Sequence, residues 1–140
     1  MFWIQSLLGR QRRQSRGGTA TVEMAICLPV MIVLLLGSIE TTDLVFLKEV
    51  LKTAAYEGAR KATAPGQTSA AGQTAALRLL TERGIASGTV TVSPTVTSST
   101  TTGTSVCVTV TAPMGSNSIL RPVVLQGISS VSAQVTMVRQ

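Results

Sequence analysis

The sequence predicts an α+β protein with a long amino-terminal helix, part of which spans a membrane, and a second helix packed on a small three-stranded antiparallel sheet. Three observations predict this class: an apolar segment at residues 19–39, a helical period that continues to about residue 63, and three segments of alternating side chains after residue 88. The 140 residues allow one modest domain besides the apolar segment.

The apolar segment, residues 19–39, has the length of a membrane-spanning helix. It contains 21 residues, and Glu23 is its only ionised side chain. About 20 mostly apolar residues are needed to cover ~30 Å of hydrocarbon at ~1.5 Å per residue. The basic residues that precede it are Arg10, Arg12, Arg13 and Arg16. Because basic residues beside a span stay in the cytoplasm, we expect the amino end inside and the carboxyl-terminal part outside.

These features divide the chain into four parts. They are a basic cytoplasmic leader at residues 1–18, the transmembrane segment at 19–39, an extracytoplasmic extension of the helix at 40–64, and a small α+β domain at 65–140. The apolar segment is longer than the core of a secretory signal peptide, and no good cleavage site follows it. Cleavage after the segment is therefore disfavoured, whereas cleavage before it, at the glycines that end the leader, remains open.

The helical pattern continues beyond the apolar segment. Apolar or small side chains recur at steps of three and four residues, which places them on one helix face. The predicted packing stripe, which follows Leu44, consists of Leu47, Leu51, Ala54, Gly58 and Ala62. Its small members allow another backbone to approach closely, either the protein's own sheet or a neighbouring helix. A single rod over residues 19–63 would be about 65–70 Å long.

The acids of this helix are predicted to form a solvated face that lysine and arginine neutralise. Two pairs have spacings that stabilise a helix in water, Glu57 with Lys61 and Glu49 with Lys52. The other acids assigned to this face are Glu40 and Asp43.

A second helix is predicted from Thr68 or Ser69 to Arg83, after a break at Pro65 and Gly66. Gly84 is its expected carboxyl-terminal cap, and Gly72 weakens the helical pattern. The predicted apolar face consists of Ala71, Ala75 and Leu79 and, one step round the helix, Ala76 and Leu80.

Three segments with a period of two residues predict strands with one buried face. The predicted inward-facing residues are Val90 and Val92, then Val106, Val108, Val110 and Ala112, then Val131, Ala133, Val135 and Met137. Residues 93–104 are predicted to form a long mobile hairpin loop. Between the last two strands, the apolar residues 119–125 either cover the open end of the core or form an exposed contact.

The composition argues against nucleic-acid binding and catalysis. The net charge is +6, but the leader holds four of the basic residues, so the remaining eight face six acids. No basic face interleaved with aromatic residues is present to stack bases. The chain has no histidine, no Cys-x-x-Cys and no phosphate-binding glycine loop. We therefore predict no enzymatic activity, no metal, no cofactor and no small-molecule substrate.

The two cysteines are predicted not to pair with each other. Cys27 lies inside the apolar segment and Cys107 in a predicted strand, so much of the bilayer would separate them. We interpret each as a small packing residue. The alternative is an intermolecular disulfide through Cys107, since the outer compartment would be oxidising.

Gly18 and Glu23 lie where the basic leader meets the apolar segment, and together with these two flanking segments they form a recognisable motif. A glycine ends a leader with four arginines, the acid lies five residues later, and an apolar segment follows. This pattern resembles the cleavage site of type IV prepilins. The stretches Gly-Thr-Ala-Thr-Val-Glu-Met-Ala-Ile-Cys-Leu-Pro-Val, from Gly18, and Ala-Ala-Tyr-Glu-Gly-Ala-Arg-Lys-Ala, from Ala54, resemble the TadE family of the tight-adherence (Flp-type) pilus system. The final strand, Ser129 to Arg139, is also similar to the ending of that family.

The resemblance implies a non-catalytic minor pilin or pseudopilin in a bacterial inner membrane. It implies cleavage between Gly18 and Thr19 by a prepilin peptidase, and partners among other pilin subunits and the assembly machinery. Glu23 would then pair with the new Thr19 amine of a neighbouring subunit, which relieves the cost of an acid in the span. The alternatives are that Glu23 is solvated at the headgroup boundary, and that the protein is an uncleaved, signal-anchored binding module outside the cytoplasm.

Overall fold

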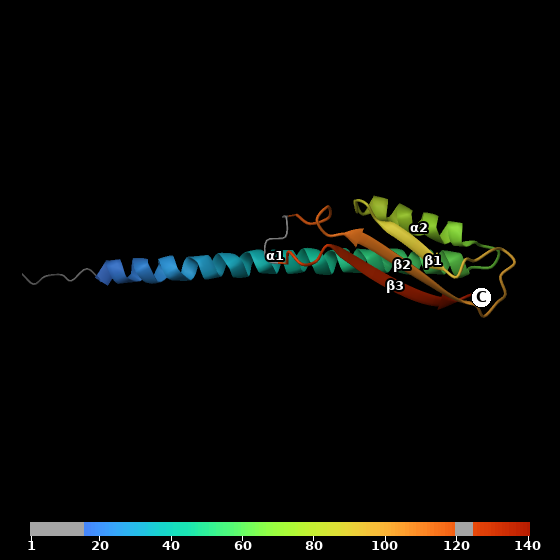
Figure 1. Ribbon diagram of the computed structural model, residues 1–140, viewed down its shortest axis with the longest axis horizontal. Helices are drawn as coiled ribbons and strands as arrows, with labels where there is room; N and C mark the ends of the chain where they lie inside the picture. The colour runs from blue at the N-terminus through green and yellow to red at the C-terminus, as the bar shows by residue number, and fades with distance from the viewer. Residues whose placement is uncertain (1–15, 120–124) are drawn as a thin grey trace, which may run out of the picture. The chain divides into compact units, whose positions relative to one another are not determined.

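The computed structural model describes residues 16–119 and 125–140. In these residues two helices are followed by three strands, as the sequence predicts, and the fold is α+β (Figure 1). The chain divides into two compact units, with the boundary between Leu34 and Leu35. Each unit is described by itself below.

Helix α1, Arg16–Thr63, contains 48 residues and includes Pro29. The backbone is already helical at Arg16, three residues before the predicted start. The helix ends where the sequence predicts, because Pro65 cannot continue it and Gly66 turns the chain with a φ of 73°. Arg60 lies in its last turn, where its positive charge interacts favourably with the negative end of the helix dipole.

Helix α2, Ser69–Glu82, begins at one of the two predicted positions and is followed by the predicted cap glycine. The Thr68 hydroxyl accepts a hydrogen bond from the amide of Ala71 at 3.4 Å, and Gly84 turns the chain after the helix with a φ of 70°. The predicted apolar face is only partly right. Ala71, Ala75 and Leu79 are half-buried, whereas the fully buried line consists of Ser69, Gly72, Ala76 and Leu80.

The buried face of α2 is displaced because the two helices pack through glycine. A Cβ at Gly72 would lie 2.7 Å from the carbonyl oxygen of Gly58, and a Cβ at Gly58 would lie 3.1 Å from the carbonyl oxygen of Gly72. The two backbones therefore meet at these positions. Gly72, which weakens the helix in the sequence pattern, is the residue that allows this contact.

The strands form one antiparallel sheet with the order β1-β2-β3. They are β1 (Thr89–Ser93), β2 (Ser105–Pro113) and β3 (Ser130–Val138). The register pairs Val90 with Val110, and Val110 with Ala133. Inward-facing residues alternate with exposed or half-exposed Ser, Thr, Cys and Gln along every strand, as predicted.

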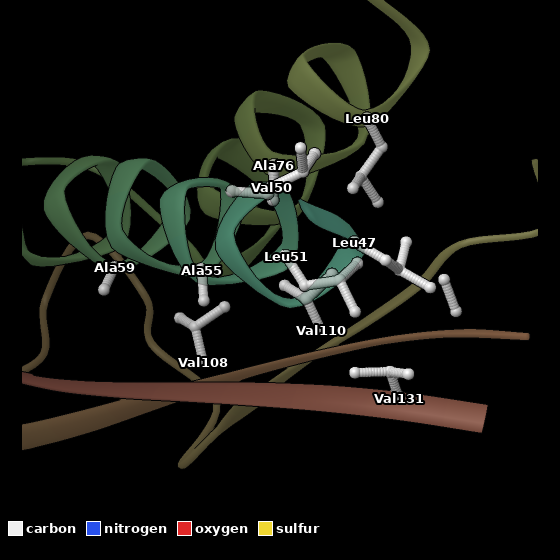
Figure 2. Close-up of a cluster of buried hydrophobic side chains, with 12 residues drawn as sticks. Leu47, Val50, Leu51, Ala55, Ala59, Ala76, Leu80, Val108, Val110 and Val131 are labelled. Carbon is white, nitrogen blue, oxygen red and sulfur yellow. The ribbon is translucent and has the colours of Figure 1, made fainter. Parts of the chain in front are cut away.

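The core of the second unit lies between the helices and one face of this sheet. In Figure 2, Ala55 of α1 points towards Val108 of β2 and Leu51 lies over Val110, while Ala76 of α2 lies beside Val50. Leu47 of α1 and Leu80 of α2 belong to the same buried cluster. Helix α2 also lies against β1. The core is built from Leu, Val and Ala, as the low aromatic content requires.

The connection between β1 and β2 has the predicted length but is anchored. Val96 is buried, its amide donates to the Ser69 hydroxyl at 2.6 Å, and its carbonyl accepts from the Ser69 amide at 2.9 Å. The prediction of a free, mobile hairpin loop is therefore wrong at Val96. A lone valine between two threonines gives a weak sequence signal for such an anchor.

Arg139 is buried, although its position near the end of a strand suggested an ordinary surface charge. Only 4% of it is exposed. Its guanidinium donates to the carbonyl oxygens of Ala62 and Gln67, each at 3.2 Å. The carbonyl of Ala62 is in the last turn of α1, so the charge lies at the negative end of the helix dipole. These bonds join the end of β3 to the end of α1.

We expect Gly72→Ala to lower the free energy of unfolding by about 1–3 kcal/mol, because its Cβ would be 2.7 Å from Ala62 Cβ and from the Gly58 carbonyl oxygen. Denaturant titration of the full chain in detergent measures this. Gly115→Ala is the matched control, because a Cβ there meets nothing within 4 Å. A control of this kind changes stability by at most about 0.5 kcal/mol. Equal stability of the two variants would contradict the close helix contact.

Candidate membrane segment and assembly site

The amino-terminal part of α1 presents an unbroken apolar surface. Every residue from 18 to 35 is exposed. Its large apolar side chains are Val22, Met24, Ile26, Leu28, Val30, Met31, Ile32, Val33, Leu34 and Leu35. Within residues 16–119 and 125–140, this is the one helix long and apolar enough to cross a membrane. The structure is therefore consistent with a single-pass membrane protein.

Glu23 lies on the exposed surface of this segment, as do Gly18 and Thr19. All three are in helical backbone near the start of the described part of α1. A Cβ at Gly18 would meet nothing within 4 Å, so neither packing nor a special backbone angle requires glycine there. Of the leader arginines, Arg16 is described as helical backbone. The predictions for Arg10, Arg12 and Arg13 lie outside the described residues.

The predicted packing stripe lies in the second unit and is buried. Leu47, Leu51, Ala54 and Ala62 have 1% exposure or less, and Gly58 is buried against Ala76 and Val108. Of the two partners considered for this stripe, the chain's own sheet and second helix are the ones that cover it. The stripe therefore belongs to the second unit, whereas Glu23 belongs to the first.

Two acids that the sequence placed on a solvated face are instead bonded to a distant segment. Glu40 is only 1% exposed, and its Oε2 accepts the amide of Leu125 at 2.7 Å. Asp43 Oδ2 accepts the Ser118 hydroxyl at 2.9 Å and the amide of Ile119 at 3.0 Å. The prediction of a solvated face is wrong for these residues, because their carboxylates satisfy the backbone amides of Leu125 and Ile119.

The sequence contained a signal for the burial of Glu40. It precedes Leu44, Leu47 and Leu51 by four, seven and eleven residues, so it belongs to the same helix face as the buried leucines. An acid on an apolar face indicates either a buried partner or a site. The identity of the partner, 85 residues away, could not be predicted.

The other acids of α1 lie at the surface. Glu57 pairs with Arg60, with distances of 2.9 and 3.1 Å, and not with Lys61 as predicted. The hydrogen bond from Arg60 lowers the pKa of Glu57, opposed by a smaller effect of burial. The bidentate geometry of the guanidinium explains the preference for arginine. An exposed pair of this kind contributes little to stability.

The cysteines lie in different environments. Cys27 is exposed on the apolar segment, whereas Cys107 is half-buried on the outer face of β2. Gln134 Nε2 donates to Cys107 Sγ at 2.7 Å, and this bond lowers the pKa of the thiol. Neither is a core residue, so the interpretation of both as packing residues is not supported. The intermolecular disulfide through Cys107 stays a prediction.

Within the described ranges, no group of three or more His, Cys, Asp or Glu side chains is placed to hold a metal ion. The expectations of no cofactor, no nucleic acid and no small-molecule substrate stay predictions from the sequence. The features that define the candidate site are the exposed apolar segment and the acid within it.

These features define a class: a protein with one apolar helix that could span a membrane, joined to a small α+β unit. Residues 18–60 match the family model described as TadE-like protein. The resemblance predicted from the sequence is confirmed over this stretch, and it indicates a protein associated with the Tad pilus. No curated protein and no solved structure matches the chain.

We expect the thiol of Cys107 to react at a lower pH than it would without Gln134. The hydrogen bond favours the thiolate, so Gln134→Leu should move the midpoint of alkylation by iodoacetamide to higher pH. The rate is measured against pH in a Cys27→Ala background. Gln126→Leu, in an exposed loop, is the control and should leave the midpoint unchanged. A midpoint insensitive to Gln134→Leu would show that this bond does not set the pKa.

Proposed function

We propose that the protein is a non-catalytic minor pilin or pseudopilin of a Tad-type pilus, which serves adhesion or secretion. In this proposal a prepilin peptidase cleaves between Gly18 and Thr19, and the apolar segment holds the protein in the inner membrane with its second unit outside the cytoplasm. The observation that carries the proposal is the apolar segment, exposed from residue 18 to 35, with a single acid five residues after Gly18. The family match over residues 18–60 supports it.

The structure gives no folding reason for glycine at position 18. Glycine in a helix interior costs about 1 kcal/mol relative to alanine, and a Cβ at Gly18 would meet no atom within 4 Å. Gly37 shares this lack of contacts. Only Gly18 lies at the boundary between the basic leader and the apolar segment, with an acid five residues later. Recognition by a peptidase would account for it.

Cleavage changes the electrostatics of Glu23. An ionised acid costs roughly 2.5–3.5 kcal/mol at the centre of a bilayer and less near its edge. Removal of residues 1–18 creates an amine on Thr19, four residues before Glu23. It also makes Thr19 the start of the helix, where the dipole favours negative charge. The amine of a neighbouring subunit would pair with Glu23 during assembly and relieve both charges.

The second unit suits a structural role in this proposal. It buries its packing stripe against its own sheet and α2, so it folds around its own core. The exposed apolar segment then remains for lipid or for the apolar helices of other subunits. The alternative function is an uncleaved, signal-anchored binding module, and the processing of the leader distinguishes the two.

We expect the protein extracted from its host membrane to lack residues 1–18. Intact-mass spectrometry measures this, and Gly18→Leu should retain the leader because a large side chain replaces the glycine at the cleavage site. Gly37→Leu is the matched control, since this glycine is also helical and free of close contacts. It should be processed normally. If the wild-type protein kept its full leader, the anchored module would be favoured.

We expect Glu23→Gln to be inserted into the membrane and processed but not assembled. Loss of one charge pair worth more than 1.4 kcal/mol corresponds to at least a roughly tenfold lower recovery with sheared filaments or assembly complexes. Recovery is measured by quantitative immunoblotting. Glu49→Gln, an exposed acid of the second unit, is the control and should assemble normally. Normal recovery of Glu23→Gln would remove the assembly role of this acid.

A further inference from the structure

We propose that the Ile119 loop, residues 115–119, rests on the bilayer surface and inserts the Ile119 side chain into the headgroup region. The partner is the lipid bilayer that holds residues 19–39. The inference rests on the membrane span of the proposed function and assigns a second membrane contact to the same protein. This contact would fix how the second unit is held above the bilayer.

Ile119 is the first observation. Its side chain is 82% exposed, the highest value among the large apolar residues that the structure describes. A single exposed apolar residue is ordinary in a soluble protein, so exposure alone identifies nothing. The position of Ile119 relative to the end of the apolar segment is what points to lipid.

The loop is fixed to the beginning of the second unit by Asp43. Its Oδ2 accepts both the Ser118 hydroxyl, at 2.9 Å, and the Ile119 amide, at 3.0 Å. One helical turn earlier, Glu40 Oε2 accepts the amide of Leu125 at 2.7 Å, on the far side of the residues that are not described. Two carboxylates of α1, one helical turn apart, thus accept the amides of Ile119 and Leu125.

The distance from the apolar segment places this loop at the membrane boundary. Ile39 is the last residue of the segment, and it belongs to the same unit as Asp43 and Ile119. Asp43 is four residues further along α1, which corresponds to about 6 Å. The headgroup layer of each leaflet is about 5–8 Å thick, from the difference between a ~30 Å core and a total of ~40–45 Å. The Ile119 amide, bonded to Asp43, would therefore lie within that layer.

The hydrogen bonds suit this environment. A backbone amide at the edge of the hydrocarbon is costly if it loses water without gaining another hydrogen-bond partner. The carboxylates of Glu40 and Asp43 accept the amides of Leu125 and Ile119 and so supply those partners. The isoleucine side chain gains from leaving water. The same arrangement in bulk water would expose the apolar group without benefit.

The test measures the depth of position 119 in vesicles. The full chain, with Cys27→Ala and Cys107→Ser, carries a nitroxide label on Ile119→Cys and is placed at low density in vesicles of phosphatidylethanolamine and phosphatidylglycerol. Collisions with oxygen, which concentrates in lipid, are compared with collisions with a water-soluble nickel complex. Val30→Cys serves as the reference within the apolar segment. Thr101→Cys, an exposed residue in the β1–β2 connection, is the aqueous reference.

We expect position 119 to show several-fold lower nickel accessibility than position 101, with oxygen accessibility between those of positions 101 and 30. Nickel accessibility equal to that of position 101, with position 30 in lipid, would overturn this inference and leave the span intact. Low accessibility to both reagents would indicate a protein contact and would also overturn it. An aqueous signal at position 30 would overturn the membrane span and this inference together.

A second variant tests the role of Asp43. Asp43→Ala removes the acceptor for Ser118 and Ile119, so the label at position 119 should gain mobility and become several-fold more accessible to nickel. Glu49→Ala, at an exposed acid of the same helix, is the control and should leave the depth unchanged. An unchanged depth in Asp43→Ala would show that this carboxylate does not hold the loop at the membrane.

Discussion

The stripe of small and apolar residues on α1, from Leu47 to Ala62, is the constraint on which the second unit depends. Its leucines meet the valines of β2, and its glycine allows the backbone of α2 to lie close. One helix face therefore supports the sheet and the second helix at once. With aromatic residues at only 3% of the chain, large side chains cannot fill gaps, so close backbone contact has to exclude water instead.

Sequence reasoning predicted the elements well, because each has a strong period. The alternation of Val with Thr or Ser determines which face of β2 is buried, and Pro65 with Gly66 ends α1 at a defined position. It failed for the face of α2, because an apolar pattern counts Gly72 as a loss. In a close helix contact, the absence of a side chain is what lets the two backbones meet. The sequence pattern of one helix does not show which second helix will pack against that glycine.

The long-range polar contacts could not be predicted for a related reason. Glu40, Asp43 and Arg139 each bond to backbone groups more than 70 residues away. Backbone amides and carbonyls have no sequence signature, so a charged residue that serves them looks like any surface charge. Only for Glu40 did the sequence indicate burial, because its spacing places it on the same helix face as the buried leucines. In the candidate site, Gly18 and Glu23 could be proposed from the sequence because their spacing and the charges around them lie within one short segment, and their roles stay predictions.

The two parts of α1 differ in what surrounds their apolar side chains. The face of α1 from Leu44 to Ala62 contributes to the core, whereas residues 18–35 expose ten large apolar side chains. Fully burying such a side chain is worth about 1.5–3 kcal/mol, so this segment forgoes on the order of 10 kcal/mol in water. That is comparable to the whole stability of a small domain. An apolar phase, of lipid or of other subunits, recovers it. The cost of one acid in a bilayer is roughly 3 kcal/mol, which is small beside this gain, so a segment that contains Glu23 can still favour an apolar phase.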